Sequence, residues 1–319
     1  MAKLYPLKFN PILKERVWGG DILTGKLGKP GENGNPVGES WEISGVQDDI
    51  SVVSNGFLMG NDLNDLVEVY LGDLVGDAIY EKFGNEFPLL IKILDIQDNI
   101  SLQIHPDDET ARDRHDSYGK TECWYIMDAA PSAKIYLGLK RELTPQELFD
   151  KCGDDSISDA LNVITPVKGD IIYIKPGTLH AATGGILLAE VQQVSDITYR
   201  VYDWGREHSK NTAREMHLDL AIDCIDYEKL DPESVVFKDG LADNPYFKIK
   251  KLEVDKSYRA ESHVFNSFII YFCVEGEAVV RGGDVTEQIK KGDNILIPAY
   301  MGEYVIEGKC TLLEITGKA

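Results

Sequence analysis

Short β-strands separated by turn residues dominate this sequence and restrict its possible folds more than any other feature. Brief runs of apolar, β-branched and aromatic residues alternate with clusters of Gly, Pro, Asn and Asp, which end strands and form turns. The predicted strands before residue 205 are 40–44, 88–96, 101–105, 122–127, 169–177, 185–193 and 197–204. This density of short strands predicts a β-sandwich or a β-barrel.

Three segments have helical periodicity instead. Residues 61–83 carry Leu, Val and Tyr at helical spacing. Residues 144–151 begin with Thr144, Pro145 and Glu147, a pattern typical of a capping box with proline at the first helical position. Residues 211–225 predict a third helix, and after about residue 231 the chain becomes rich in strands again.

A weak internal repeat suggests how the strands are organised. The segment "KGDIIYIKPGTLHA" (168–181) parallels "KGDNILIPAYMGEY" (291–304), and Glu303 falls where the first copy has His180. Two similar turns could arise by chance, but two related β-barrels in tandem explain the repeat as well. If the chain contains two tandem barrels, we expect a catalytic, metal-binding domain over 1–231 and a degenerate β domain over 232–319. The first domain would carry helical insertions at about 61–84, 144–164 and 211–225.

Composition excludes several classes of partner. The 319 residues are 43% hydrophobic, enough to bury real cores, and the formal net charge is −21. This charge argues against nucleic acid or an anionic membrane as the main partner, whereas a small anion could still bind where Lys and Arg converge. The five cysteines are widely spaced and form no CxxC, and the N-terminus has no apolar signal segment, so we expect a soluble, cytoplasmic protein.

The stretch "SLQIHPDD" (101–108) contains the first candidate metal ligands. Gln103 and His105 lie two residues apart, so on a strand their side chains share one face. Glu122 begins another strand, and His180 follows a Pro-Gly turn at the end of a third. Turn-anchored strand ends can bring such donors together around a metal. Each residue also has an ordinary structural explanation, and spacing alone does not decide between the two.

Longer motifs carry a resemblance to a known family. The segments "LLIKILD", "SLQIHPDD", "GKTECWYI", "KPGTLHA" and "DITYRVYDW" resemble the type I phosphomannose isomerases of the cupin superfamily, in their short bacterial form. The resemblance runs from "VWGG" near the start to about residue 217, with a weaker tail. It implies jelly-roll β-barrels in tandem with a small helical part, and a zinc-dependent enzyme that interconverts mannose 6-phosphate and fructose 6-phosphate.

The resemblance also assigns roles to residues. The metal ligands of the family fall on Gln103, His105, Glu122 and His180, and its active-site basic residues on Lys92, Lys120 and Arg200. In one respect the chain departs from larger members: Gly119-Lys120-Thr121-Glu122 stands where they have His-Lys-Pro-Glu. They also carry a larger helical insertion.

The chemistry of an aldose–ketose isomerase favours these residue types. A proton moves between C1 and C2 through an enediolate, and a divalent metal such as Zn²⁺ stabilises the developing negative oxygen. Two His, one Glu and one neutral Gln leave such a site with a formal charge of +1. The phosphate needs local cations, and Lys92, Lys120, Lys175, Arg200 and Arg206 all lie in or beside the motif strands.

The proton-transfer base is less clear from the sequence. Lys120 lies two residues from Glu122, and a neighbouring metal ion would lower its pKa. Glu190 and Asp196 are the alternatives, and Asp196 is also a candidate for substrate binding together with Lys92, Lys120 and Arg200. The predicted catalytic group is therefore Arg200, Lys120 and Glu190.

Two other hypotheses remain at this stage. A different cupin metalloenzyme, such as an iron dioxygenase, would use the same strands, but the Gln ligand and the cationic cluster weigh against redox chemistry. A non-catalytic sugar-binding cupin could hold a metal without turnover. The sequence does not fix the oligomeric state, and a monomer or a small homo-oligomer is expected.

Overall fold

The computed structural model describes residues 3–31 and 34–319 as two compact units. Residues up to Ile12, Trp41–Lys92 and Gly240–Ala319 form the first unit, and Leu13–Ser40 and Ile93–Asp239 form the second. The division falls within β2 (Val37–Ser44) and β3 (Leu89–Ile96) and after the first residue of β1 (Ile12–Gly20).

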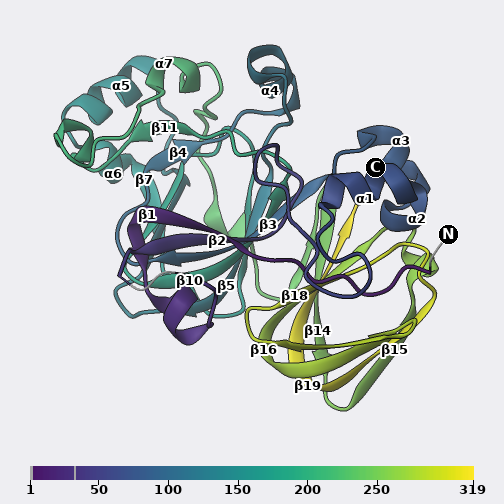
Figure 1. The fold of residues 1–319 in the computed structure, drawn as a ribbon. Coiled ribbons are helices and arrows are strands. Elements are labelled where there is room, and N and C mark those ends of the chain that lie inside the picture. The colour runs from purple at the N-terminus through teal and green to yellow at the C-terminus, as the bar shows by residue number, and fades with distance from the viewer. Residues whose placement is uncertain (1–2, 32–33) are drawn as a thin grey trace. The chain divides into compact units, whose positions relative to one another are not determined.

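The second unit is built around two antiparallel sheets (Figure 1). Their strand orders are β1-β2-β3-β10-β5-β8-β12 and β11-β4-β9-β6-β7. In the larger sheet, the strands not yet given are β5 (Glu122–Ala129), β8 (Ile171–Ile174), β10 (Ile186–Gln193) and β12 (Val236–Phe237). In the smaller sheet they are β4 (Leu102–Ile104), β6 (Lys134–Leu139), β7 (Leu161–Ile164), β9 (His180–Thr183) and β11 (Tyr199–Tyr202).

The two sheets share one apolar core. Side chains such as Ile104 and Ile135 from the smaller sheet pack with Trp124, Ile172 and Leu188 from the larger one, and all five are fully buried. Because successive strand residues face opposite sides, this core explains the alternation of apolar residues in the predicted strands. The expected β-barrel of the cupin, or jelly-roll, type is confirmed.

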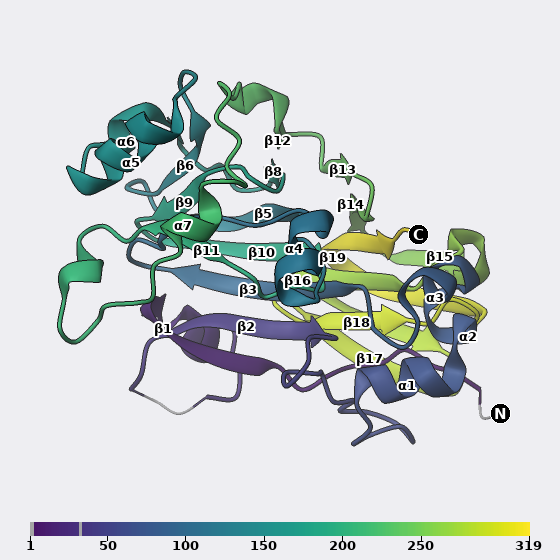
Figure 2. The same ribbon diagram turned by 90° about the horizontal axis from the view of Figure 1, so that it is seen from above.

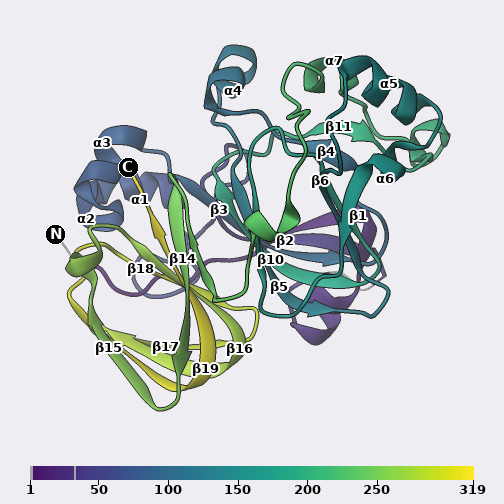
Figure 3. The same cartoon turned by 180° about the vertical axis from the view of Figure 1, so that it is seen from behind.

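The helices of the second unit lie outside its sheets, and α5, α6 and α7 gather on one side (Figures 1 and 3). The helical segments are η1 (a π-helix, Ile22–Lys26), α4 (Asp108–His115), α5 (Pro145–Gly153), α6 (Ile157–Ala160), η2 (Arg206–His208), α7 (Leu218–Ala221) and η3 (Pro232–Ser234). The capping box predicted at Thr144 is present, since Thr144 and Glu147 exchange side-chain to backbone hydrogen bonds.

The predicted helix over 211–225 is wrong for most of its length. Only Leu218–Ala221 form an α-helix, and residues 209–217 follow an irregular path. Tertiary contacts override the helical pattern: Arg214 is drawn to the buried Asp203, and the backbone N–H of His217 donates to the carbonyl of Arg200. These bonds replace the local ones that a helix would have made.

The first unit contains a second barrel of antiparallel strands with three short helices at one end (Figures 1 and 3). Its strands are β13 (Leu241–Asp243), β14 (Phe247–Val254), β15 (Ser257–Glu261), β16 (Ile269–Gly282), β17 (Val285–Lys290), β18 (Asn294–Ile297) and β19 (Glu303–Gly317), with η4 at Ser262–Phe265. Figure 2 shows β16, β18 and β19 side by side, as their pairing requires.

The helix predicted over 61–83 is divided into α1 (Leu63–Tyr70), α2 (Gly72–Val75) and α3 (Asp77–Phe83). The breaks fall at Leu71 and Gly76, whose φ angles are 51° and 98°. Positive φ is incompatible with an α-helix, and a Cβ on Gly76 would lie 2.6 Å from the carbonyl oxygen of Asn266. The segment is therefore helical, as its spacing predicts, but the chain turns twice within it.

The second barrel contains a hydrogen-bonded group of three tyrosines and a carboxylate. The Tyr271 hydroxyl donates to Glu314 Oε2 at 2.9 Å and lies 2.7 Å from the Tyr304 hydroxyl, while Tyr258 donates to the same carboxylate at 3.2 Å. Glu303, which the repeat aligned with His180, is exposed. The repeated turn is therefore present in both barrels, but the second one carries no histidine at that point.

Among the residues that the structure describes, no helix has the length and apolar character that crossing a bilayer requires.

Candidate metal centre and active site

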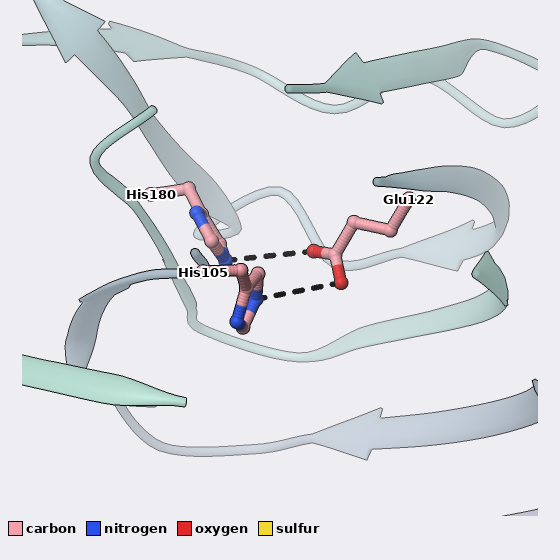
Figure 4. Close-up of side chains that lie close together, drawn as sticks. All are labelled: His105, Glu122 and His180. Carbon is pink, nitrogen blue, oxygen red and sulfur yellow. Dashed lines mark ion pairs between the residues drawn. The ribbon is translucent and has the colours of Figure 1, made fainter. Parts of the chain in front are cut away.

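Three buried side chains of the second unit converge on one point (Figure 4). One ligand atom each from His105, Glu122 and His180 lies within 4.8 Å of the others. His105 Nε2 is 3.5 Å from one carboxylate oxygen of Glu122, and His180 Nε2 is 3.4 Å from the other. The sequence placed these residues on separate strand ends, and the fold brings them together.

Backbone carbonyls orient both imidazole rings. His105 Nδ1 donates to the carbonyl of Ile197 at 2.9 Å, and His180 Nδ1 donates to that of Thr178 at 2.8 Å. Since a carbonyl can only accept, each ring carries a proton on Nδ1, and its Nε2 points toward Glu122. This is the arrangement in which histidines usually bind metal ions.

His180 is prepared to act as a neutral ligand. Burial lowers its pKa to about 4, because the charged imidazolium loses its hydration. The nearby ammonium of Lys120 also lowers this pKa, whereas the hydrogen bond to Thr178 opposes the shift. At neutral pH the ring is uncharged, as metal coordination requires.

Gln103 lies beside this group. Its Nε2 is 3.3 Å from His180 Nε2, and its Oε1 accepts a hydrogen bond from the Ser101 hydroxyl. A half-turn of the amide about its last bond presents Oε1 to the same point. Two neutral imidazoles, one carboxylate and one amide oxygen make a donor set that suits a divalent cation of the zinc, manganese or iron type.

A tight turn delivers His180 to the cluster. Gly177 has φ +78°, and a Cβ there would lie 2.4 Å from the carbonyl oxygen of Cys224. The Gly177 N–H donates to the carbonyl of His105, and its own carbonyl accepts from the N–H of Asp226. The Pro-Gly turn that carries His180 is thus bonded directly to the backbone of His105, another candidate ligand.

A second set of contacts, which the sequence analysis missed, holds the segment that carries Lys120. Asp108 Oδ1 accepts from the Gly119 N–H and from Gln193 Nε2, both at 2.9 Å, and Gln193 Oε1 accepts from the Thr121 N–H at 2.8 Å. A Cβ on Gly119 would lie 2.6 Å from the backbone of Asp107 and Asp108. Asp108 in "HPDD" and Gly119 in "GKTE" were the sequence signal for these contacts, because no other predicted role accounts for them.

Lys120 extends into the site beside two carboxylates. Its Nζ lies 3.0 Å from Glu122 Oε2 and 3.7 Å from Glu190 Oε1, and all three side chains are almost completely buried. Burial by itself would lower the pKa of Lys120, but the charges of Glu122 and then Glu190 outweigh it and raise the pKa above its ordinary value. In this arrangement Lys120 is an ammonium ion.

Glu190 is fixed from the opposite side. Its Oε2 accepts a hydrogen bond of 2.8 Å from the indole N–H of Trp124, the residue directly across the β5–β10 ladder. With Lys120 on its other oxygen, Glu190 is held between two donors. The geometry suits a residue that positions the lysine.

The remaining candidates lie at three different places. Arg200 stands directly across the β4–β11 ladder from Gln103, so the two side chains share one face of the sheet. Asp196 is exposed, one residue before Ile197, whose carbonyl orients His105. Lys92 belongs to the first unit, where its ammonium lies 5.0 Å from the ring centroid of Trp41. The roles of these residues in substrate binding and catalysis stay predictions.

Comparison with known proteins agrees with the fold. Residues 7–148 match the family model "Phosphomannose isomerase type I, catalytic domain", and residues 240–316 match "Mannose-6-phosphate isomerase, cupin domain". The chain is 34% identical to the mannose-6-phosphate isomerase ManA of Bacillus subtilis over 95% of its own length and 96% of that protein. It is 29% identical to the mannose-6-phosphate isomerase of Streptococcus mutans, with 97% of each chain covered.

Solved structures show the same relationship. The mannose 6-phosphate isomerase of Bacillus subtilis superposes with a TM-score of 0.86 at 32% identity, covering 98% of this chain and 99% of that one. Variants of the phosphomannose isomerase from Salmonella typhimurium share the fold with a TM-score near 0.77 at 16% identity.

A β-barrel with a buried cluster of two histidines and one glutamate is the architecture of a cupin metalloprotein. Within that class the chain belongs to the type I phosphomannose isomerase family, whose members are known as mannose-6-phosphate isomerases.

Proposed function

We propose that this chain interconverts mannose 6-phosphate and fructose 6-phosphate through an enediolate. The observation that carries the proposal is the buried convergence of His105, Glu122 and His180 next to an ammonium ion, Lys120. Isomerisation creates negative charge on a sugar oxygen, and a divalent cation held by these residues, together with the Lys120 ammonium, would stabilise that charge where the surrounding protein excludes water. The chain is 34% identical to a mannose-6-phosphate isomerase over 95% of its length, which supports the assignment of mannose 6-phosphate as the substrate.

We infer that the metal is zinc and that His105, Glu122, His180 and the amide oxygen of Gln103 hold it. The two imidazoles and the carboxylate are common zinc ligands. A bound divalent ion supplies Lewis acidity toward the carbonyl and hydroxyl oxygens of the open-chain sugar. The neutral Gln103 leaves the site with a net positive charge, which a second carboxylate would cancel.

The chain's own residues supply the rest of the chemistry. Lys120, as an ammonium ion, donates a hydrogen bond to a sugar oxygen and stabilises negative charge on it. Glu190 fixes the position of Lys120, and Trp124 fixes Glu190. Arg200, which shares a face with Gln103, contacts the substrate beside that candidate ligand.

Asp196 is the residue that we favour as the base between C1 and C2. Glu190 already accepts from Trp124 and pairs with Lys120, and the charges of Glu122 and Glu190 raise the pKa of Lys120, so we disfavour both residues as the base. Asp196 is an exposed carboxylate on the short segment whose Ile197 carbonyl contacts His105. In D₂O, Asp196→Asn is expected to abolish deuterium exchange at C2, whereas Glu190→Gln slows it without abolishing it.

The decisive test is a coupled assay of mannose 6-phosphate conversion on purified protein, on chelator-treated protein, and after zinc is restored. Activity that disappears with the chelator and returns with zinc is the expected result. Bound zinc without conversion would instead support a sugar-binding cupin. Oxygen consumption with iron bound would support a dioxygenase, the other alternative.

We expect the enzyme to act in the cytoplasm on a small sugar phosphate, without nucleic acid or membrane partners, as a monomer or a small homo-oligomer. The formal charge of −21 and the absence of a membrane-spanning helix among the described residues support this expectation.

A further inference from the structure

Arg200 lies on a strand that is short, irregular and at the edge of its sheet. β11 is the outermost strand of the smaller sheet and spans only Tyr199–Tyr202. Its register against β4 shifts between Arg200 and Tyr202, so the ladder is interrupted directly after Arg200. Such a strand makes few ladder bonds, and the backbone on its open side needs other partners. The sheet alone therefore does not fix the position of Arg200.

His217 supplies the missing partners. The Arg200 N–H donates to His217 Nδ1 at 3.2 Å, and the His217 N–H donates to the carbonyl of Arg200 at 2.8 Å. Arg200 Nη1 also donates to the carbonyl of Glu215, two residues earlier. The segment 215–217 thus satisfies both backbone polar groups of Arg200 and holds its guanidinium by one bond, as a neighbouring strand could not.

The ring of His217 packs against Tyr199, the neighbour of Arg200. The two ring centroids are 6.4 Å apart with an interplanar angle of 33°. Tyr199 is itself buried, and its hydroxyl lies 2.7 Å from His115 Nε2 at the end of α4. This packing restricts rotation of the imidazole and keeps Nδ1 facing the Arg200 N–H.

The bond from Arg200 fixes the protonation state of His217. A backbone N–H can only donate, so Nδ1 carries no proton and the imidazole is neutral. Burial lowers the pKa of His217 below its ordinary value, and the positive charges of Arg200 and of protonated His115 act in the same direction. Glu215 opposes the shift, but its carboxylate is 3.9 Å away and its side chain is 86% exposed.

Protonation of His217 would reverse this arrangement. An imidazolium carries a proton on Nδ1, which would face the Arg200 N–H donor to donor and add a second positive charge beside the guanidinium. The His217 side chain is 22% exposed, so a proton from solvent can reach it. The charged and titratable groups that face the ring are Arg200 and Tyr199 on β11, His115 on α4 and Glu215 on its own segment. Of these groups, only Glu215 favours the charged ring.

We propose that His217 is a positioning residue for Arg200, and that only its neutral imidazole fulfils this role, so that acid weakens the reaction at a point outside the candidate metal centre. The inference rests on the proposed function, in which Arg200 contacts the substrate. It deepens that function by naming a group that acts through Arg200 without touching the substrate.

Two substitutions at position 217 separate the hydrogen bond from the proton. His217→Ala removes the acceptor. His217→Asn keeps one, because the asparagine side-chain oxygen lies as many bonds from the backbone as Nδ1 does, and it does not titrate. In the zinc-loaded enzyme at neutral pH, His217→Ala is expected to lower kcat for mannose 6-phosphate about tenfold with unchanged zinc content, whereas His217→Asn stays close to wild type. Thermal unfolding checks that each variant folds.

The pH dependence of kcat is the readout that a purely structural role would not move. Wild-type activity should decline where His217 takes up a proton, and in His217→Asn this decline should shift to lower pH. Titration of the substrate phosphate affects both proteins alike. His263→Asn, at an exposed position in the first unit, is the matched control and should reproduce the wild-type profile. Profiles of wild type and His217→Asn that coincide on the acid side would overturn the inference, even if His217→Ala does not fold.

A double variant tests whether His217 acts through Arg200. If it does, His217→Ala will lower kcat in the wild-type background but cause little further loss in Arg200→Ala. Fully additive losses, or wild-type kcat in His217→Ala, would refute the inference and leave the isomerase intact.

Hydrogen exchange of the Arg200 amide, followed by NMR at one pH, tests the contact without turnover. Exchange should be faster in His217→Ala than in wild type and His217→Asn, because the alanine offers no acceptor. Equal exchange in all three proteins would overturn the contact and with it the inference. Protein that shows the expected difference but converts no mannose 6-phosphate would support the contact and overturn the proposed function.

Discussion

Four side chains from different parts of the second unit define the candidate metal centre, and two of them owe their orientation to backbone carbonyls. The carbonyls of Ile197 and Thr178 hold His105 and His180 with Nε2 toward Glu122. Ile197 lies outside the motif that contains His105, so the motif does not reveal that contact, whereas Thr178 lies two residues before His180 in the same motif.

His105→Ala should remove the metal and the activity together. Loss of one imidazole leaves the ion with an incomplete set of protein ligands, and we expect zinc below stoichiometric occupancy and kcat/KM reduced by at least 100-fold. Elemental analysis and the coupled assay measure the two effects. His263→Ala, at an exposed position, is the control. Full activity with stoichiometric zinc in His105→Ala would show that the metal assignment is wrong.

Glu190→Gln tests the ionisation of Lys120. The negative charge of Glu190 helps to raise the pKa of Lys120, so its removal should lower that pKa. If the ammonium form is required, kcat/KM of the variant will begin to fall at a lower pH on the alkaline side. The pH–rate profiles of wild type and Glu190→Gln measure this shift, with Glu147→Gln on an exposed helix as the control. If the two pH–rate profiles coincide on the alkaline side, Glu190 does not control the ionisation of Lys120.

At the scale of elements, turns determine where the ligands meet. The Pro-Gly turn before β9 fits between the backbones of His105 and Cys224, and the Gly119 turn fits against Asp107 and Asp108. Both turns exclude a side chain. The glycines of "KPGTLH" and "GKTE" are thus explained by close packing of backbone rather than by flexibility.

Gly177→Ala should destabilise the protein and weaken metal binding. Alanine at φ +78° is strained, and its Cβ would lie 2.4 Å from the carbonyl oxygen of Cys224. We expect a loss of about 1–3 kcal/mol in the free energy of unfolding. Chemical denaturation and a zinc titration measure the effects.

Gly153→Ala is the control for the substitution itself. Gly153 ends α5, and nothing lies within 4 Å of the Cβ that alanine would add. Alanine there should be neutral or slightly stabilising. Equal stability of the two variants would mean that the Gly177 turn does not depend on its lack of a side chain.

At the scale of the whole molecule, metal binding and folding are coupled. A divalent ion that binds only the folded site stabilises the protein by mass action. The chelated protein should therefore melt at a lower temperature than the zinc-loaded protein at neutral pH. Equal melting temperatures with zinc bound would contradict a metal site formed by residues from separate strands.

The stability of the chelated protein should also depend on pH through His180. The unfolded histidine takes up a proton as the pH falls through its ordinary pKa of 6.5, whereas folded His180 resists protonation until about pH 4. Its contribution to stability is complete above pH 6.5 and is lost progressively between pH 6.5 and 4. Melting temperatures over this range, compared between wild type and His180→Gln, isolate the effect, and identical slopes would refute it.

The strand-rich architecture and most strand positions follow from local signals in the sequence, and the resemblance of its motifs to a family nominates the four candidate metal ligands. Alternating apolar residues and turn residues are local signals, and residues two apart on a strand must share a face. The same local signals correctly placed the capping box at Thr144.

How those residues are used depends on the tertiary structure. Residues 211–217 lie in a segment with helical periodicity, yet they form no helix, and Arg214 there pairs with the buried Asp203. The ammonium state of Lys120, the anchoring of Glu190 by Trp124 and the bonds between His217 and Arg200 all depend on contacts between residues far apart in the chain or on burial. Charge interactions and desolvation depend on distance in space, which no spacing in the sequence specifies.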